Sequence, residues 1–166
     1  MERKRVICIV GPTASGKSAL GVLVAHAVHG EVISADSRQV YRGLNIGSGK
    51  ITLDEMGGIP HHLLDIADPK NVFTASDFVR EGGKVFTSIL VRNHTPVVVG
   101  GTGFYIDALL GGVTLPKVPP NEILRHELEK KTLEELQELL KEKDPERFLT
   151  VDTKNPRRLI RALEIA

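Results

Sequence analysis

The chain has 166 residues, of which 41% are apolar, and a formal net charge of +1. This length suits one α/β domain with a sizeable core and is too short for two ordinary domains. The small net charge excludes a global attraction to nucleic acid, so any such contact must come from a local basic patch. The single cysteine, Cys8, excludes an internal disulfide, and the composition favours a reducing cytoplasm.

The amino-terminal segment predicts a strand rather than a targeting sequence. Residues 1–5 are mostly charged and lead into a short apolar run at residues 6–10. That run is too short for a signal-peptide core or a membrane span. We therefore expect no targeting segment, no membrane contact and a cytoplasmic protein. The run has the length of a buried strand, so Cys8 within it is expected to be a core thiol.

The segment after this strand is a phosphate-binding loop, or P-loop. Residues 11–18 carry two glycines separated by four residues and followed by Lys and Ser. Gly11 and Gly16 let the backbone wrap closely around an anion, and amides at the start of a helix point at it. Lys17 adds a positive charge, and the Ser18 hydroxyl can ligate Mg²⁺. The expected phosphate-binding residues are Gly11, Pro12, Thr13, Ala14, Ser15, Gly16, Lys17 and Ser18.

A helix and a second strand follow the P-loop. The helix is expected to have an apolar side and to end at Gly30, and residues 31–35 form the strand. The apolar side consists of Leu20, Leu23, Val24 and Val28. Asp36 follows the strand, and in a parallel sheet this edge is where ligands bind. An Asp that merely caps a turn is the alternative. Residues 37–50 are polar and glycine-rich, which is typical of a long functional loop.

The middle of the chain adds two strands and two helices. His61 and His62 open a short strand, where they point to opposite faces and are poorly placed to share a metal ion. Thr74 and Asp77 form a capping box for a helix that ends near residue 93. Gly82 and Gly83 predict close packing or a bend in this helix.

The strand at residues 95–99 runs into a second glycine-rich turn on the ligand edge. Gly100, Gly101 and Gly103 lie in this turn, and a helix follows it. Thr102 presents a hydroxyl near the amino end of that helix, with a plain turn threonine as the alternative. No Asp closes the strand, and no arginine-rich lid is recognisable. Both absences favour a bound diphosphate leaving group over phosphoryl transfer.

Beyond a Gly- and Pro-rich bridge, the last third of the chain predicts charged helices at residues 121–131 and 133–143. Asn155 and Pro156 then open a helix with an apolar inner side. Its inner residues are Leu159, Ile160 and Leu163, and its basic residues are Arg157, Arg158 and Arg161. Cations in the first turn oppose the helix dipole, a penalty that a bound polyanion would remove. Surface arginines without a ligand are the alternative.

These patterns predict an α/β fold, namely a P-loop three-layer fold with a central parallel sheet and a helical appendage. The expected parts are a P-loop catalytic core at 1–112, a helical appendage at 113–150, and an arginine-bearing helix at 151–166 that returns to the core. We expect them to form a single structural unit.

Five segments, in this order, resemble tRNA dimethylallyltransferases: residues 11–18, 36–47, 60–65, 99–103 and 155–164. The resemblance covers nearly all of the chain, although members of that family continue well beyond the last segment. It implies transfer of a dimethylallyl group from dimethylallyl diphosphate to the exocyclic amine of the adenine beside the tRNA anticodon, with Mg²⁺. The P-loop would then hold the prenyl diphosphate.

The resemblance also implies roles for individual residues. Asp36 corresponds to the general base, and Lys17 and Thr102 complete the catalytic set, with Ser18 on the metal. The expected partners are a tRNA anticodon stem-loop and dimethylallyl diphosphate, bound by a monomer. The tRNA-contacting positions are Asp36, Ser37, Arg38, Gln39, Thr102, Arg125, Arg157, Arg158 and Arg161.

Three other functions remain open from the residues. A P-loop small-molecule kinase would use the same loop for phosphoryl transfer. An adenylate isopentenyltransferase would prenylate a free nucleotide in place of tRNA. A truncated, catalytically inactive form would bind nucleic acid without turnover.

Overall fold

The computed structural model describes residues 5–166, so residues 1–4 of the charged amino-terminal segment lie outside the described part. The chain forms two compact units, Met1–Leu115 and Pro116–Ala166. Each unit has its own elements and core, and the P-loop belongs to the first. Within residues 5–166, no helix has the length and apolar character that crossing a membrane requires.

The first unit is built on a parallel sheet in which the strand order differs from the chain order. The order is β1-β4-β2-β3, and all neighbours are parallel. Its strands are β1 (Ile7–Val10), β2 (Gly30–Ser34), β3 (His61–His62) and β4 (Thr95–Gly100). Because β4 lies between β1 and β2, the segments after β1 and β2 both meet at the end of β4. This switch in strand order is where open α/β sheets bind ligands.

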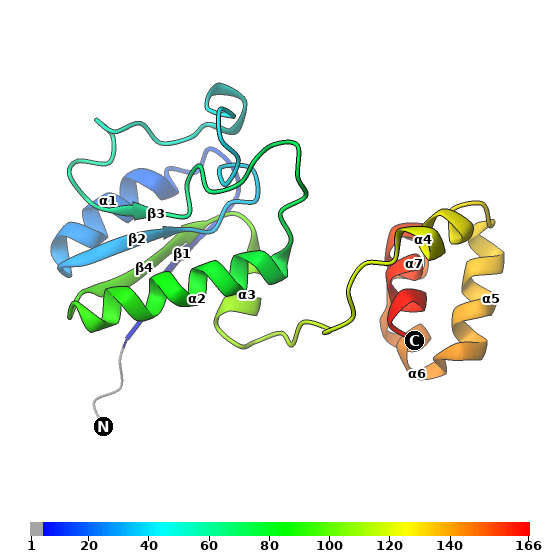
Figure 1. Cartoon of the computed structure of the whole chain (residues 1–166). Coiled ribbons are helices and arrows are strands. Elements are labelled where there is room, and N and C mark those ends of the chain that lie inside the picture. The colour runs from blue at the N-terminus through cyan, green and yellow to red at the C-terminus, as the bar shows by residue number, and fades with distance from the viewer. Residues whose placement is uncertain (1–4) are drawn as a thin grey trace. The chain divides into compact units, whose positions relative to one another are not determined.

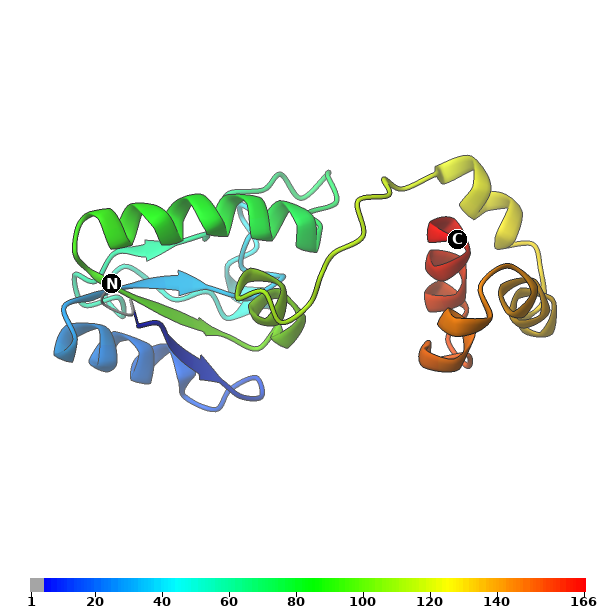
Figure 2. The ribbon, with the colours of Figure 1, turned by 90° about the horizontal axis from the view of Figure 1, so that it is seen from below.

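Helices cover both faces of this sheet, which confirms the expected three-layer arrangement. Helix α1 (Lys17–Ala27) lies on one face, and α2 (Ala75–Val91) and α3 (Gly103–Leu109) lie on the other (Figure 1, Figure 2). A one-turn 3₁₀ helix, η1 (Ile46–Ser48), lies within the long loop after β2. The predicted limits of the main elements are right to within a few residues.

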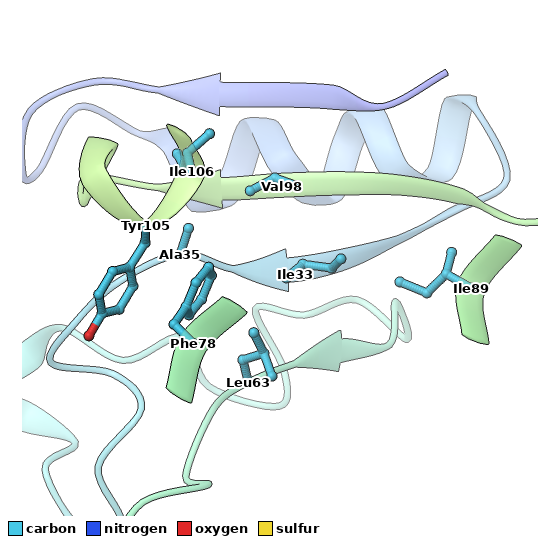
Figure 3. Close-up of a cluster of buried hydrophobic side chains, with 8 residues drawn as sticks. All are labelled: Ile33, Ala35, Leu63, Phe78, Ile89, Val98, Tyr105 and Ile106. Carbon is cyan, nitrogen blue, oxygen red and sulfur yellow. The ribbon is translucent and has the colours of Figure 1, made fainter. Parts of the chain in front are cut away.

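The α2 and α3 face holds a cluster of buried apolar side chains (Figure 3). The rings of Phe78 and Tyr105 are stacked, with centroids 4.4 Å apart. Gly82 is closely packed as expected, because a β-carbon there would lie 3.1 Å from Leu109 of α3. On the α1 face, Ala25 packs with alternate residues of the sheet, which are Ile9, Val32, Val97 and Val99.

The expected burial of the first strand and helix is partly wrong. Cys8 is exposed rather than a core thiol, and Val10 is 62% exposed. The reason is that β1 is an edge strand, paired only with β4 among the described strands. In α1, Leu20 and Leu23 are also exposed, at 50% and 68%. The buried residues of α1 are Gly21, Val22 and Ala25, and of the expected apolar side Val24 and Val28 pack against the sheet cluster.

The end of α1 also differs from the expectation. Gly30 does not close the helix but is the first residue of β2, and the left-handed residue is His29, with φ of 52°. Gly30 has a packing role, because a β-carbon there would lie 2.6 Å from the carbonyl oxygen of Thr95. Glycine at this position therefore lets β2 and β4 approach each other.

The two histidines of β3 point to opposite faces, as the strand period predicts. His62 lies on the α2 face, where its Nε2 is 2.6 Å from the carboxylate of Glu31. The side chain of Glu31 is 3% exposed and also contacts Arg92 and His94, at 2.7 Å and 2.6 Å. Hydrogen bonds from Arg92 and then from the two histidines outweigh burial and lower the pKa of Glu31 to about 2.

The second unit is a small helical bundle. Its helices are α4 (Glu122–Leu128), α5 (Leu133–Lys143), α6 (Pro145–Thr150) and α7 (Pro156–Ile165). Helix α5 has the predicted limits and the predicted capping box of Thr132 and Glu135. The core contains side chains from α4, α5 and α7: Leu128, Leu136, Leu140, Leu159, Ile160, Ala162 and Leu163. Residues 151–166 thus share a unit with 116–150, and their return to the P-loop core stays a prediction.

Candidate functional site

The P-loop has the backbone shape that wraps an anion. Gly16 precedes α1 in a left-handed conformation with φ of 81°, and Ala14 also has a positive φ of 61°. Lys17 is the first residue of α1, and its Nζ donates hydrogen bonds to the carbonyl oxygen of Pro12 and to the Ser15 hydroxyl. The ammonium group therefore lies across the loop. Charge and amides at a helix start favour a bound phosphate group.

The ends of β2 and β4 approach each other very closely beside this loop. A β-carbon on Gly100 would lie 2.1 Å from the carbonyl oxygen of Ala35, so only glycine fits there. The same carbonyl accepts a hydrogen bond from the Thr102 amide, at 3.1 Å. The Thr102 hydroxyl in turn accepts one from the Ser37 amide, also at 3.1 Å. These contacts fix the position of Asp36 between the two strand ends.

Asp36 has one carboxylate oxygen engaged by its own turn. Oδ1 accepts hydrogen bonds from the amides of Arg38 and Gln39, at 2.8 Å and 3.4 Å. Oδ2 receives none from the described residues. Asp36 thus caps a turn and also lines the same cavity as the P-loop. A carboxylate held in this way can accept a proton at Oδ2.

The cavity has a volume of about 500 Å³ and lies on the α1 side of the sheet edge. P-loop and α1 residues 13–19 line it, together with Asp36 and Gly100. Its larger apolar side chains come from the sheet and from the loop segment after it, and they are Val32, Val99 and Ile51. Gln39, Glu55 and His61 also line it. Cavities of this size hold small ligands, mostly through apolar walls and a few polar groups.

Residues 48–57 form one wall of this cavity and are called the covering segment here. Its first residues are held by Gln39, whose Nε2 donates to the carbonyls of Ser48 and Gly49, at 3.4 Å and 3.2 Å. Lys50 follows with a nearly buried side chain, and its Nζ contacts the carbonyl of Tyr41 at 2.7 Å. Lys50 also forms an ion pair with Asp65. These contacts fix the start of the covering segment.

The end of the covering segment is fixed by a tight turn and by α1. The Glu55 carboxylate accepts hydrogen bonds from the amide and hydroxyl of Thr52, both at 2.8 Å. The backbone hydrogen bond and then the hydroxyl lower the pKa of Glu55. The carbonyl of Gly57 lies 3.1 Å from Nε2 of His26 on α1. The covering segment is therefore attached to the helix that follows the P-loop.

His61 forms part of the wall on the β3 side. It pairs with Val32 in the parallel register, so the two side chains share the α1 face. Its Nδ1 lies 2.8 Å from the carbonyl of Ile59, and burial lowers its pKa from 6.5. The ring is therefore neutral at pH 7 and donates through Nδ1, which leaves Nε2 as an acceptor. The sequence alone indicates only that His61 is poorly placed to share a metal ion with His62.

The four arginines of the second unit that are expected to contact tRNA fall into two groups. Glu164 is buried and contacts Nε of Arg125 at 2.8 Å, NH1 of Arg161 at 2.5 Å and the amide of Asn121 at 2.6 Å. Burial raises the pKa of Glu164, but these hydrogen bonds outweigh it and lower the pKa to about 2. Arg157 and Arg158 are instead exposed at the start of α7.

A comparison with protein families identifies the family of the chain. The family model described as IPP transferase matches residues 39–166. The chain belongs to the IPP transferase family.

Relatives and solved structures of the IPP transferase family agree with this assignment. A tRNA dimethylallyltransferase 2 of Syntrophotalea carbinolica is 47% identical over 97% of this chain and 54% of its own length. A second, from Shewanella sediminis, is 46% identical over 100% of this chain and 55% of its own length. The chain thus spans about half the length of the curated relatives that it matches.

Two solved structures show the same fold. The tRNA isopentenylpyrophosphate transferase of Bacillus halodurans is 43% identical, with a TM-score of 0.67 over 98% of this chain and 55% of that one. A eukaryotic dimethylallyltransferase acting on tRNA is 33% identical, with a TM-score of 0.84 over 98% of this chain and 41% of that one. The P-loop α/β fold expected from the sequence is therefore confirmed.

The structure gathers only some of the site residues that resemblance to the IPP transferase family implies. The P-loop residues 13–18, Asp36 and Gln39 line one cavity, and Ser37 and Thr102 are joined beside it by a hydrogen bond. Arg38 is exposed on the same turn. The four remaining expected tRNA contacts belong to the second unit: Arg125, Arg157, Arg158 and Arg161.

A magnesium ion would have few protein ligands here. Among residues 5–166, no group of three or more His, Cys, Asp or Glu side chains is arranged to hold a metal ion. Ser18 lies in the first turn of α1 and lines the cavity, as does Asp36. This sparse oxygen set suits Mg²⁺, which usually keeps several waters and is bound together with substrate phosphates.

Proposed function

We propose that this chain transfers a dimethylallyl group from dimethylallyl diphosphate to the exocyclic amine of the adenine beside the anticodon of tRNA. The observation that carries the proposal is a single cavity lined by the P-loop, by Asp36 and by apolar side chains of the sheet and the covering segment. A relative named tRNA dimethylallyltransferase 2, 47% identical over nearly the whole chain, supports this reaction.

The P-loop acts on the leaving group. Breaking the bond between the allylic carbon and the diphosphate oxygen leaves positive charge on the carbon and negative charge on the diphosphate. The amides of residues 13–18 and the Lys17 ammonium stabilise that negative charge. To do so, Lys17 exchanges its hydrogen bond to the Pro12 carbonyl for one to the diphosphate. Ser18 would hold Mg²⁺, which supplies further charge neutralisation when it is bound with the diphosphate.

Asp36 acts on the nucleophile. The exocyclic amine of adenine is a weak nucleophile, and it must lose a proton as its bond to carbon forms. Oδ2 of Asp36 accepts that proton, while Oδ1 remains bound to the amides of Arg38 and Gln39. An adenine stacked in an RNA loop cannot reach this carboxylate, so it must be flipped out into the site.

The test is an incubation of the chain with dimethylallyl diphosphate, Mg²⁺ and a tRNA anticodon stem-loop, followed by analysis of the nucleosides for prenyl-adenosine. A parallel reaction with AMP as the acceptor distinguishes a free-nucleotide prenyltransferase. A reaction with ATP in place of the prenyl diphosphate distinguishes a kinase. The Lys17→Ala variant is the control and should be inactive, because it lacks the one full positive charge of the loop.

Absence of prenyl-adenosine in the stem-loop reaction would contradict the proposal. Equal binding of dimethylallyl diphosphate by the parent chain and by Lys17→Ala would reject the P-loop as its site.

A further inference from the structure

The covering segment brings one large apolar side chain, that of Ile51, into a cavity that polar side chains also line. Gln39 donates its amide hydrogens to the carbonyls of Ser48 and Gly49. The Glu55 carboxylate is engaged by Thr52, and His61 donates to the carbonyl of Ile59. The amide hydrogens of Gln39, Oε2 of Glu55 and Nδ1 of His61 therefore have protein partners, whereas Nε2 of His61 is left as an acceptor.

A hydrocarbon chain needs no hydrogen-bond partner and is bound by contact with apolar side chains. The larger apolar side chains that line the cavity are Val32 of β2, Val99 of β4 and Ile51 of the covering segment. Val32 and Val99 are buried at 2% and 7% exposure and belong to the α1-side core. Their positions are set by the sheet.

Ile51 differs from these two valines because it lies in a loop and not in a strand. Its neighbours on both sides are nevertheless held by hydrogen bonds. On one side, Lys50 is bound to the carbonyl of Tyr41 and to Asp65. On the other side, Thr52 and Glu55 close a turn with three hydrogen bonds. A side chain held between two such anchors keeps its position when a ligand enters, which is what selectivity between ligands requires.

We propose that Ile51 is a specificity-determining residue that contacts the hydrocarbon chain of the prenyl diphosphate. Together with Val32 and Val99, it makes this site bind a diphosphate ester with a longer hydrocarbon chain more tightly than one with a short chain. The inference rests on the proposed function, since it assumes that the P-loop holds the diphosphate. Beyond the proposed function, the inference assigns recognition of the hydrocarbon chain to Ile51 of the covering segment.

The experiment measures calorimetric binding of two ligands with the same charged head, methyl diphosphate and dimethylallyl diphosphate, in the presence of Mg²⁺. The parent chain should bind dimethylallyl diphosphate at least about tenfold more tightly than methyl diphosphate, because one methylene group in an apolar pocket can contribute about tenfold. Ile51→Ala should bind dimethylallyl diphosphate about tenfold more weakly than the parent. Its affinity for methyl diphosphate should stay within about twofold of the parent value.

Two further variants complete the design. Leu53→Ala is the matched control, because Leu53 lies two positions away in the same segment, is 83% exposed and does not line the cavity. It should bind both ligands as the parent does. Ile51→Val removes a single methylene and keeps the shape of the segment, so it should give a smaller loss than Ile51→Ala. If circular dichroism shows that Ile51→Ala is unfolded, Ile51→Val is used in its place.

The outcomes separate the two claims. Unchanged preference for dimethylallyl diphosphate in folded Ile51→Ala, or in Ile51→Val if the former is unfolded, would overturn the inference and leave the proposed function in place. An equal loss of both ligands in these variants would assign Ile51 to the fold of the segment and overturn its role in specificity. Failure of the parent chain to bind either diphosphate would overturn the proposed function and the inference with it.

Discussion

The carboxylate of Asp36 has its two oxygens in different roles, and this permits a clean substitution. Asp36→Asn should keep the hydrogen bonds that Oδ1 accepts from the amides of Arg38 and Gln39, while the side chain loses its basicity. Turnover should fall about 10²–10⁴-fold, or roughly 3–5 kcal/mol in the barrier. The measurement is single-turnover prenylation of a stem-loop at saturating substrates.

The control for Asp36→Asn is thermal unfolding, which should match that of the parent because the turn is retained. A rate within about tenfold of the parent value would be too small for the loss of a general base. Weaker diphosphate binding that extra Mg²⁺ restores would instead assign Asp36 to the metal ion.

The arginines of the second unit should divide into RNA contacts and structural residues. Arg157 and Arg158 are exposed, so replacing both with Ala should leave stability unchanged and weaken stem-loop binding. Each lost phosphate contact should lower the slope of log Kd against log salt concentration by about 0.7. Fluorescence anisotropy across a salt series measures this slope.

Arg161→Ala is the contrasting variant. It removes one hydrogen-bond donor from the buried carboxylate of Glu164, so the second unit should lose about 1–3 kcal/mol of stability. An Arg161→Ala chain as stable as the parent, with the larger loss of RNA affinity, would reverse the assignment of these residues.

At the scale of elements, the contact between the ends of β2 and β4 assembles the site. Gly100→Ala should separate these ends, because its β-carbon would lie 2.1 Å from the Ala35 carbonyl oxygen. Overpacking of this kind costs about 1–3 kcal/mol, and diphosphate affinity should fall with it. Gly101→Ala is the adjacent control, since its nearest atom would lie at an ordinary 3.5 Å. Urea unfolding of both variants checks the difference, and equal stability would contradict it.

Elements with local signals were predictable from the sequence. The capping boxes at Thr74 and Thr132 and the Asn155 cap with Pro156 each depend on residues within one turn, and all three are present. Helix α6 has the same kind of signal in Asp144 and Pro145, and the sequence reading overlooked it. The exposure of Cys8 was not predictable in this way, because it depends on which strand lies at the sheet edge. That of Leu23 depends on which side of α1 is covered by the rest of the unit.

The residues of the candidate site also divide into those with a local sequence signal and those placed by long-range contacts. The P-loop and Asp36 could be found, because each follows directly on a recognisable strand. Ile51 and Glu55 could not, since the covering segment is positioned by hydrogen bonds to residues far along the chain, such as His26 and Asp65. His61 could have been placed beside Val32 had the register of β2 and β3 been known.

For the whole molecule, one buried glutamate in each unit links stability to pH. The pKa of Glu31 is lowered to about 2 by hydrogen bonds from Arg92, His62 and His94. For Glu164, burial raises the pKa, but hydrogen bonds from Arg125 and its neighbours lower it to about 2. Because both values lie below the 4.5 of a free glutamate, each contribution is complete above pH 4.5 and is lost as the pH falls towards 2.

The free energy of unfolding should therefore decrease on acidification, with about 3 kcal/mol of the loss in the first unit coming from Glu31. Urea unfolding between pH 6 and pH 2.5 measures the decrease. Glu31→Gln should be less stable than the parent at pH 6 and should lose less on acidification. If the variant and the parent showed the same pH dependence, the carboxylate of Glu31 would not be the group responsible.

The strand order of the sheet also bears on how the protein is made. Both β1 and β2 pair with β4 and not with each other, so β1 has no strand partner until Thr95–Gly100 has been synthesised. A nascent chain that ends before β4 already contains the P-loop and Asp36, but nothing yet holds them together. Translation proceeds from the amino terminus at about 5–20 residues per second, so this interval lasts for seconds. The P-loop and Asp36 are thus synthesised before β4, and they come together only after β4 has followed.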